Sequence, residues 1–514
     1  MIPIVSRASA RSWLAKTLRG ALQSRIGALS TADPAKLSVG FVLAMLVCVS
    51  HAQDPKPAAS SGNRSQVNVA VDDDTAGDRL SGKGEYAAAL KSYQAALAIR
   101  QKLVAANPSD LNLQRALSLS QTNIGDTLSA QGEFGAALKY YQAALAIDRQ
   151  LAAADPSNAT WQHDLSVSLG DIGDSLKAQG DLQAALKSYQ AALVIDQKLL
   201  AAEPSSTRWQ RDLSVDHENI GDALLAQGDL DGAVKSYRAD LAIAQKLAAS
   251  DPSNTKWQRD LSVSDNKLGD TLIAQGNLAA ALENYQAALA IRQKLVAGDP
   301  TNWKWQRDLS TSYSKIGTTS SSHGNLAAAI TNYTEALMIR QKLIGIDPSN
   351  LDWQNEVAFT DDRLGDVFDD MPNLESALKC YQAALAIRQK LAATDPLNTD
   401  FQRNLSISDN KLGDVFRAQS KNDAAFKSYQ AGFAIRQKLA ATDPTNAAWQ
   451  MDLVRSLWEI GTLDTAANPD AEKVKFLTKA LALVQKLRDS GHLGPTQESW
   501  FARLNKELDK YKAK

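Results

Sequence analysis

Hydrophobic residues recur at helical spacing along most of this chain, in blocks of fixed length. In residues 253–300, Trp257, Leu261, Leu268 and Leu272 are separated by four or seven positions, which is the spacing of one helical face. A second stripe follows from about Leu278 and ends before an Asp-Pro step. Each block therefore predicts two helices, joined at a glycine and closed by a proline turn.

The blocks repeat every 48 residues without an insertion. The segment YQAALAIRQKL occurs at residues 93–103, 285–295 and 381–391. The same step generates three columns of residues. The tyrosine column is Tyr93, Tyr141, Tyr189, Tyr237, Tyr285, Tyr333, Tyr381 and Tyr429, and Leu477 takes its place in the ninth block. The turn column is Asp155, Glu203, Asp251, Asp299, Asp347, Asp395 and Asp443, each before a proline. The aromatic column is Trp161, Trp209, Trp257, Trp305, Trp353, Phe401 and Trp449. A period of this length indicates a stacked-repeat architecture.

The pattern within one block resembles the tetratricopeptide repeat. Leu268-Gly269, Leu272, Gly276, Ala281, Tyr285 and Ala288 fall at the offsets of that signature, and Ile124-Gly125, Gly132, Ala137, Tyr141 and Ala144 do so again. The block has 48 residues, whereas that repeat has 34. Lengthened repeats of this kind resemble those of kinesin light chains and of many bacterial repeat proteins. The resemblance implies an all-α, right-handed superhelical solenoid of about nine repeats over residues 66–488.

The two ends of the chain differ from the repeats. Residues 1–52 carry six basic residues, then the apolar run VGFVLAMLVCV and Ser50-His51-Ala52, the pattern of a secretory signal peptide with a long basic region. We expect export to the bacterial periplasm or medium, and an uncleaved N-terminal anchor is the alternative. Residues 53–65 predict a flexible linker. Residues 489–514, with Trp500, Leu504 and Leu508 on one face, predict a capping helix.

Charge and composition limit the classes of partner that the chain can be expected to bind. Loss of residues 1–52 would remove six bases and one acid, so the net charge of −1 would become −1 − 5 = −6. An acidic array does not favour nucleic acid as a partner. The apolar run is shorter than the about 20 residues of a membrane span, so we expect no stable span after cleavage. The sequence leaves the oligomeric state open.

Catalytic motifs are missing from the sequence. It contains no phosphate-binding glycine loop, no nucleophile elbow and no cysteine pair at metal spacing. We therefore expect neither an enzyme nor a cofactor or metal. The expected function is that of a scaffold or adaptor that binds a protein or peptide. A glycan or cell-wall ligand module, or a recently duplicated array with little specialised function, are the alternatives.

One acidic column is the candidate binding site. An aspartate follows the first glycine in most blocks, and in the tetratricopeptide family this position faces the concave groove. The candidate residues of this column are Asp126, Asp174, Asp222, Asp270, Asp366 and Asp414. A ladder of carboxylates would hold a basic peptide through charge-assisted hydrogen bonds. Alternatively, each aspartate forms local bonds that fix its own helical hairpin.

Two blocks depart from the pattern. Thr318 replaces the aspartate in one block, and the next contains Asp361, Asp362, Asp366, Asp369 and Asp370, with Pro372 in place of glycine. These acids would cluster on one side of a helix, so Asp362 and Asp369 join the candidates. Drift of a decayed repeat is the alternative. The aromatic column either stacks on sugars or packs between hairpins, and the leucines on its face favour packing.

Overall fold

The computed structural model describes residues 61–494 and 497–512, and this part of the chain is all-α. It contains 19 helices and no strand, arranged as nine consecutive pairs and a final single helix. Within each of two compact units, each helix packs against the next one along the chain. The expected all-α repeat solenoid is therefore confirmed. The chain divides into two compact units at Ser250, and each is described separately.

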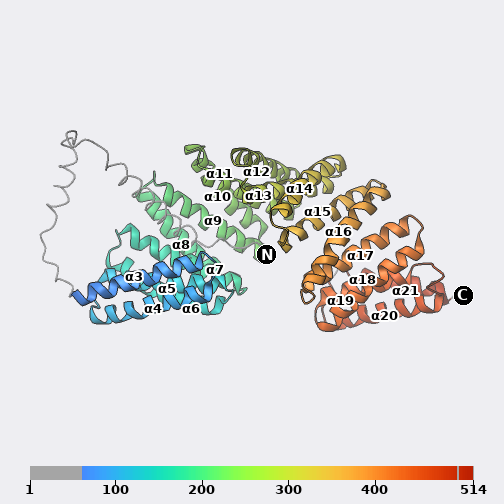
Figure 1. The fold of residues 1–514 in the computed structure, drawn as a ribbon, viewed down its shortest axis with the longest axis horizontal. Coiled ribbons are helices and arrows are strands. Elements are labelled where there is room, and N and C mark those ends of the chain that lie inside the picture. The colour runs from blue at the N-terminus through green and yellow to red at the C-terminus, as the bar shows by residue number, and fades with distance from the viewer. Residues whose placement is uncertain (1–60, 495–496, 513–514) are drawn as a thin grey trace. The chain divides into compact units, whose positions relative to one another are not determined.

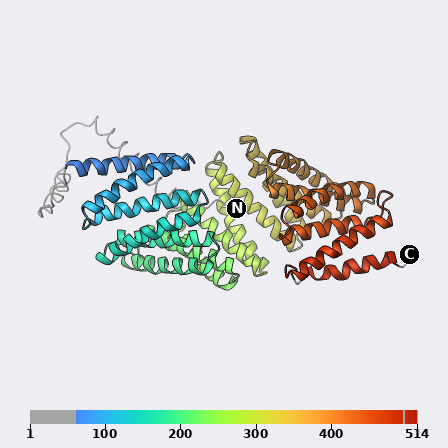
Figure 2. The ribbon, with the colours of Figure 1, turned by 90° about the horizontal axis from the view of Figure 1, so that it is seen from below.

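Unit 1 contains four helix pairs, shown in blue to green in Figure 1. They are α3 (Ser61–Ser81) with α4 (Tyr86–Ala106), α5 (Leu111–Ala130) with α6 (Phe134–Ala154), α7 (Ala159–Ala178) with α8 (Leu182–Ala202), and α9 (Thr207–Gln227) with α10 (Leu230–Ser250). The members of a pair lie side by side and antiparallel (Figure 2). We call the odd-numbered helix of each pair the first helix and the even-numbered one the second.

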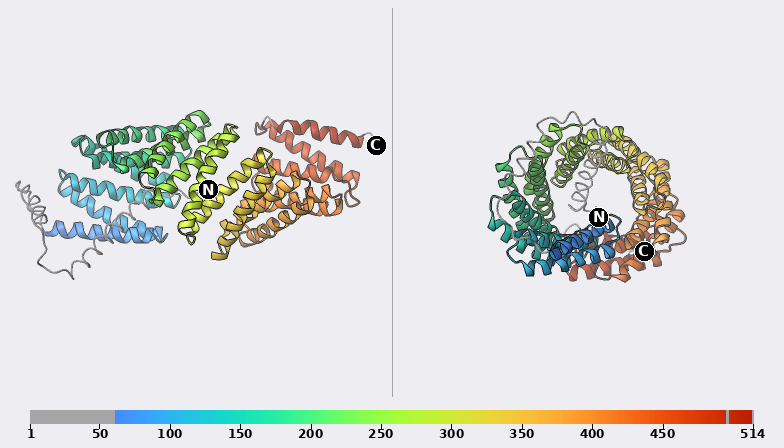
Figure 3. Two further views of the ribbon diagram at one scale, coloured as in Figure 1. Left: turned by 90° about the horizontal axis from the view of Figure 1, so that it is seen from above. Right: turned by 60° about the vertical axis from the view of Figure 1, so that its left-hand side comes forward.

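Unit 2 contains five further pairs and the last helix. They are α11 (Thr255–Ala274) with α12 (Leu278–Gly298), α13 (Trp303–Ser322) with α14 (Leu326–Ile346), α15 (Leu351–Asp370) with α16 (Leu374–Thr394), α17 (Thr399–Ala418) with α18 (Asn422–Thr442), α19 (Ala447–Gly461) with α20 (Asp470–Asp489), and then α21 (Ser499–Lys512). The final helices, orange to red in Figure 3, lie against one another.

The helix ends follow from local residue chemistry. The side chain of Asn254 accepts a hydrogen bond from the Trp257 amide (3.2 Å) and caps α11. Gly276 ends the same helix with φ +79°, a left-handed conformation that glycine adopts without strain. The predicted bounds of the second helix, Leu278 to the residue before Asp299, agree with α12. Pro372 and Ser420 occupy the glycine position with φ of 30° and 58°.

The hydrophobic core runs from one pair into the next. Tyr141 and Leu145 on α6 cluster with Leu169 and Ile172 on the following first helix α7. The aromatic column contributes to these contacts, since Trp209 and Trp353 are 5% exposed and Phe401 is 9% exposed. These three therefore pack between hairpins, as the sequence predicted, while Trp161, Trp257, Trp305 and Trp449 are half-buried. No pair buries its apolar surface alone, which explains the need for stacking.

The terminal predictions have different outcomes. The predicted signal peptide, residues 1–52, lies outside the described residues. Helix α3 begins at Ser61, so the last part of the predicted linker is helical. At the other end, α21 covers only Ser499–Lys512 of the expected 489–514, and its Leu504 and Leu508 are buried against α19 and α20. No helix of the described residues has the length and hydrophobicity of a membrane span.

Candidate functional site: the face of the first helices

The aspartate column and the tyrosine column form one bonded unit within each pair. The Tyr285 hydroxyl donates to Oδ1 of Asp270 at 2.6 Å. Tyr93, Tyr141, Tyr189, Tyr237, Tyr381 and Tyr429 donate to Asp78, Asp126, Asp174, Asp222, Asp366 and Asp414 at 2.6–2.9 Å. Burial, together with Asp270, raises the pKa of Tyr285, so the tyrosine remains the donor. The aspartates therefore form local hydrogen bonds within their own hairpin, which was the alternative to ligand binding.

The glycine that recurs in the first helices α3 to α17 makes room for this tyrosine. A Cβ on Gly269 would lie 2.6 Å from the Tyr285 ring, and one on Gly365 would lie 2.4 Å from Tyr381. In the exceptional pair, the Thr318 hydroxyl lies 2.8 Å from the Tyr333 hydroxyl and takes over the bond. The column therefore has a structural role in every pair where it occurs, and binding by its second carboxylate oxygens stays a prediction.

Within each unit, ion pairs link the first helices of successive repeats along one face. One row joins Arg115 to Asp164 (2.5 Å), Arg259 to Asp308 (2.7 Å), Arg307 to Glu356 (2.6 Å) and Arg403 to Asp452 (2.6 Å). A second row involves the candidate aspartates directly. Lys177 pairs with Asp222 at 3.4 Å, Lys315 with Asp270 at 2.5 Å, and Lys411 with Asp366. We call this surface the first-helix face.

The second row changes the charge expected of this face. Asp270 and Asp366 each bind both a tyrosine and a lysine of the following repeat, so their charges are balanced. The same position as Lys315 and Lys411 holds Lys267, Arg363 and Glu459 in unit 2, but Asn123, the buried Asp171 and Asn219 in unit 1. No lysine or arginine therefore occupies this position in unit 1, where the candidates Asp126 and Asp174 lie, each half-buried.

The acids predicted to cluster on one side of α15 do not form one accessible group, because some are buried and others are exposed. Asp362 is 4% exposed, and its Oδ2 lies 2.5 Å from Nη2 of Arg388, so it cannot serve as an accessible groove residue. Burial raises the pKa of Asp362, and Arg388 opposes that shift. Asp369 is exposed, and partial burial and Asp414 raise its pKa. No group of metal ligands occurs among the described residues.

A buried charged column, which the sequence analysis missed, lies in the second helices. Arg292 is 4% exposed and donates to Ser262 Oγ at 3.1 Å in its own pair and to Ser312 Oγ at 2.9 Å in the next. Asp148, at the same position in α6, accepts from Ser118 and Ser168, both at 2.6 Å. The column is Arg100, Asp148, Asp196, Arg292, Arg340, Arg388 and Arg436. Each of these charged residues follows the column tyrosine by seven positions and so lies on the same helix face, and this spacing could have indicated its burial.

Comparisons with known proteins agree with this geometry. Residues 118–155 and 266–300 match the family model described as tetratricopeptide repeat. No curated protein matches the chain. The apo form of RapI has a similar structure, with 10% identity, a TM-score of 0.50, and coverage of 77% of this chain and 99% of RapI. That likeness shows the fold alone.

Two other solved structures are similar to part of the chain. BtubC (BKLC) from P. vanneervenii is 20% identical, with a TM-score of 0.40 and coverage of 49% of this chain and 90% of its own. A protein of Podosopora anserina, described as a kinesin light chain with nearly identical TPR-like repeats, is 18% identical, with a TM-score of 0.34 and coverage of 46% and 99%.

Proposed function

The chain is a tetratricopeptide-repeat protein, and from this premise we propose that it is a non-catalytic scaffold whose first-helix face binds a partner protein or peptide. Repeats of this family generally mediate contacts between proteins. A continuous face of stacked helices offers an extended surface, and side chains from several repeats can contact one ligand simultaneously. The ion pairs between successive first helices support a stiff face that needs little ordering on binding.

We place the ligand on unit 1 and give it a basic character. The observation that carries this proposal is that Asn123 and Asn219 occupy the position of the unit 2 lysines next to Asp126 and Asp174, where unit 1 has no lysine or arginine. A lysine- or arginine-rich segment would place cations beside Asp126 and Asp174, as Lys315 and Lys411 lie beside Asp270 and Asp366 in unit 2. Charge-assisted hydrogen bonds to carboxylates are stronger than neutral ones and fix the register of the ligand.

The test separates ligand binding from the bond to tyrosine. In the double variant Asp126→Asn and Asp174→Asn, each amide oxygen still accepts the tyrosine hydroxyl, while two negative charges are lost. We expect the variant to retain the thermal midpoint of the wild type and to bind a lysine-rich decapeptide about tenfold more weakly by fluorescence anisotropy. Capture of partners from a periplasmic fraction should weaken in parallel.

A matched variant controls for net charge. Glu85 and Glu133 lie at the starts of α4 and α6 and make no side-chain cap bond, so Glu85→Gln with Glu133→Gln removes the same two charges elsewhere on unit 1. We expect it to bind like the wild type. Equal loss of binding in both double variants would reduce the effect to long-range charge and would overturn the assigned site.

Export is part of the proposal. The basic and apolar residues of segment 1–52 support secretion followed by cleavage after Ala52. Expression in a bacterial host and fractionation should yield a periplasmic protein whose first residue, by N-terminal sequencing, is Gln53. Retention of the full-length chain in the membrane fraction would favour the uncleaved anchor instead.

A further inference from the structure

The acid–proline turns of unit 2 carry exposed apolar side chains. We call the three consecutive turns Asp299–Asn302, Asp347–Asn350 and Asp395–Asn398, with the residues that flank them, the turn edge of unit 2. Trp303 is 41% exposed, Ile346 is 59% exposed and Leu397 is 91% exposed, one at each turn. Since successive repeats stack in register, as the ion pairs Arg259–Asp308 and Arg307–Glu356 show, these side chains lie along one edge.

Each of the three is a departure from the repeat toward a larger apolar residue. The position of Leu397 holds serine or threonine elsewhere, namely Ser109, Ser157, Ser205, Ser253, Thr301, Ser349 and Thr445. The position of Ile346 holds Ala106, Ala154, Ala202, Ser250, Gly298, Thr394 and Thr442. The position of Trp303 holds alanine, threonine or leucine in the other pairs. Isolated exposed apolar residues are common, but three on one edge indicate a contact surface.

The departure at Leu397 also removes a local hydrogen bond. At the equivalent turns the aspartate accepts from the hydroxyl two residues later, as Asp299 does from Thr301 and Asp347 from Ser349, both at 2.6 Å. Leucine has no hydroxyl, so the Asp395 turn lacks this bond. The substitution weakens its own turn and exposes an apolar side chain, and neither change stabilises the repeat.

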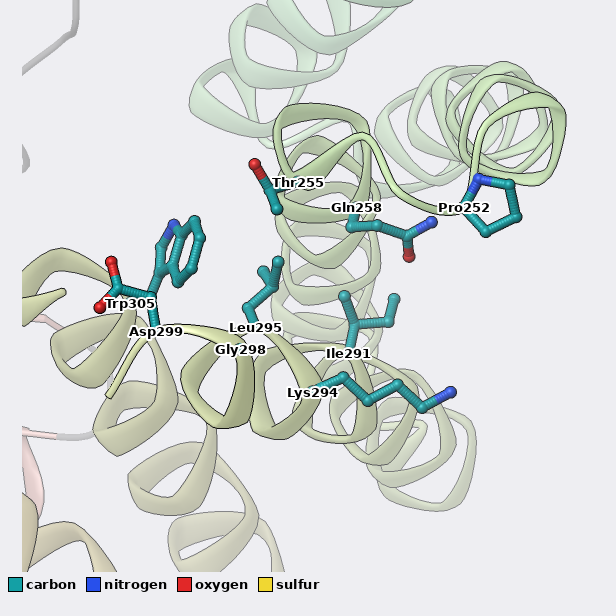
Figure 4. Close-up of a pocket in the computed structure, with 9 residues that line it drawn as sticks. All are labelled: Pro252, Thr255, Gln258, Ile291, Lys294, Leu295, Gly298, Asp299 and Trp305. Atoms are coloured by element: carbon teal, nitrogen blue, oxygen red, sulfur yellow. The ribbon is translucent and has the colours of Figure 1, made fainter. Parts of the chain in front are cut away.

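A cavity on the same edge complements these side chains. It has a volume of about 260 Å³ and lies between α11, α12 and α13, where Thr255 and Gln258 face Ile291 and Leu295 and where Trp305 forms one side (Figure 4). Its lining is mainly apolar, with Lys294 and Asp299 as its charged members. A cavity of roughly 150 Å³ can hold benzene, so this one has room for a leucine side chain.

We propose that the turn edge of unit 2 is an interface with a second copy of this chain, in which Leu397 of one copy enters the Trp305 cavity of the other. The cavity and Leu397 are separated along the edge by the turn that carries Ile346. A two-fold axis near Ile346 therefore places the Leu397 of each copy at the cavity of its partner, and both contacts form together.

The charges on this edge, which recur at the other turns, are compatible with such an antiparallel pair. Each turn combines an exposed lysine with the turn aspartate five residues later: Lys294 with Asp299, Lys342 with Asp347 and Lys390 with Asp395. Reversal of a second copy brings lysines opposite aspartates, and Asp395 then approaches Lys294 beside the buried Leu397. The edge is complementary to itself, as a two-fold interface requires.

The experiment is sedimentation velocity of the purified protein over a range of concentrations. We expect a monomer–dimer equilibrium that Leu397→Ser or Ile346→Ala weakens about tenfold or more. Both changes restore the residue type of the other repeats, so the fold is expected to persist. Lys294→Asp should also weaken the dimer, and addition of Asp395→Lys to that variant should restore it.

Val194→Ala in unit 1 is the matched control. Val194 is 49% exposed on α8, away from the turns, and alanine occupies the same position in α4 and α6. It should leave the dimer unchanged. A wild type that stays monomeric at about 100 µM, where even a weak dimer forms, would exclude the second copy as occupant. Failure of the charge exchange to restore the dimer would exclude the proposed register. Neither result bears on the first-helix face, which peptide binding tests independently.

Discussion

Glycine at the end of each first helix is the residue whose replacement has the most direct energetic consequence. The left-handed conformation costs a residue with a Cβ about 1 kcal/mol or more, whereas glycine adopts it freely. Six repeats have glycine there, from Gly84 to Gly324, while Ser420 adopts the same conformation with φ 58°. The repeat of α17 and α18, like the preceding one with Pro372 at φ 30°, therefore contains a local strain that the repeats with glycine lack.

We predict that Ser420→Gly stabilises the protein by about 1 kcal/mol. The measurement is the midpoint of urea unfolding followed by circular dichroism. Gly276→Ser is the reciprocal control, because Gly276 has φ +79° at the same position, and it should destabilise by a similar amount. Equal midpoints for all three proteins would show that this turn does not limit stability.

At the scale of the element, the buried charge at this position of most second helices joins one pair to the next. Arg388 on α16 pairs with Asp362 on α15 and donates to Ser408 Oγ on α17 at 2.7 Å. It also donates to the Asn404 carbonyl at 3.1 Å. A single guanidinium therefore joins three helices, and both ions of the pair are 6% exposed at their side chains.

We predict that Arg388→Met destabilises the protein by about 3–5 kcal/mol, because it leaves the Asp362 charge buried without its partner. The double variant Arg388→Met with Asp362→Leu should recover most of that loss, since an apolar pair needs no compensation. Denaturant unfolding of the two variants measures the difference. Arg363→Met, at an exposed arginine of the same region, controls for loss of a cation and should change stability by under about 0.5 kcal/mol.

Helix positions could be predicted from sequence because they depend on local signals, namely the Asp-Pro step, the glycine and the apolar stripe. The aspartate column could also be found, but its tyrosine partner is 15 residues away on another helix and depends on how the pair packs. Ion partners 45 and 49 residues apart depend on the register between repeats, which a single repeat does not determine. Arg292 was overlooked because a charged residue on an apolar stripe is normally assigned to the surface.

At the scale of unit 2, buried acids couple the stacking of repeats to pH. Burial raises the pKa of Asp265 and Asp409 to about 6, and that of Asp361 and Glu459 to about 7. Asp362 adds to the shift of Asp361, and Asp414 to that of Glu459, while Arg292 and Arg436 oppose the shifts of Asp265 and Asp409. All four lie on first helices, at positions that contact neighbouring helices.

The sign of the effect follows from proton linkage. Each of these acids has a higher pKa in the folded protein than in the unfolded chain, so between about pH 5 and 8 the folded state binds more protons. Stability should therefore increase as the pH falls through about 7 to 6, the range of the folded pKa values. The half-buried turn residues Asp299, Asp347 and Asp443 have lowered pKa values because the hydroxyl two residues later donates to each carboxylate, and their contribution to stability is lost only below about pH 4.

We predict a higher midpoint of urea unfolding at about pH 5.5 than at about pH 8, and a smaller difference in the variant Asp361→Asn with Asp409→Asn, which cannot titrate at these positions. Burial lowers the pKa of His217, so this histidine in unit 1 acts in the opposite direction, and comparison of variant with wild type cancels its contribution. Glu283→Gln, at an exposed position of α12, should keep the full difference. If the double variant also keeps the full difference in urea midpoint, the pH dependence has another source. The charge of these acids then does not affect how stably the first helices stack.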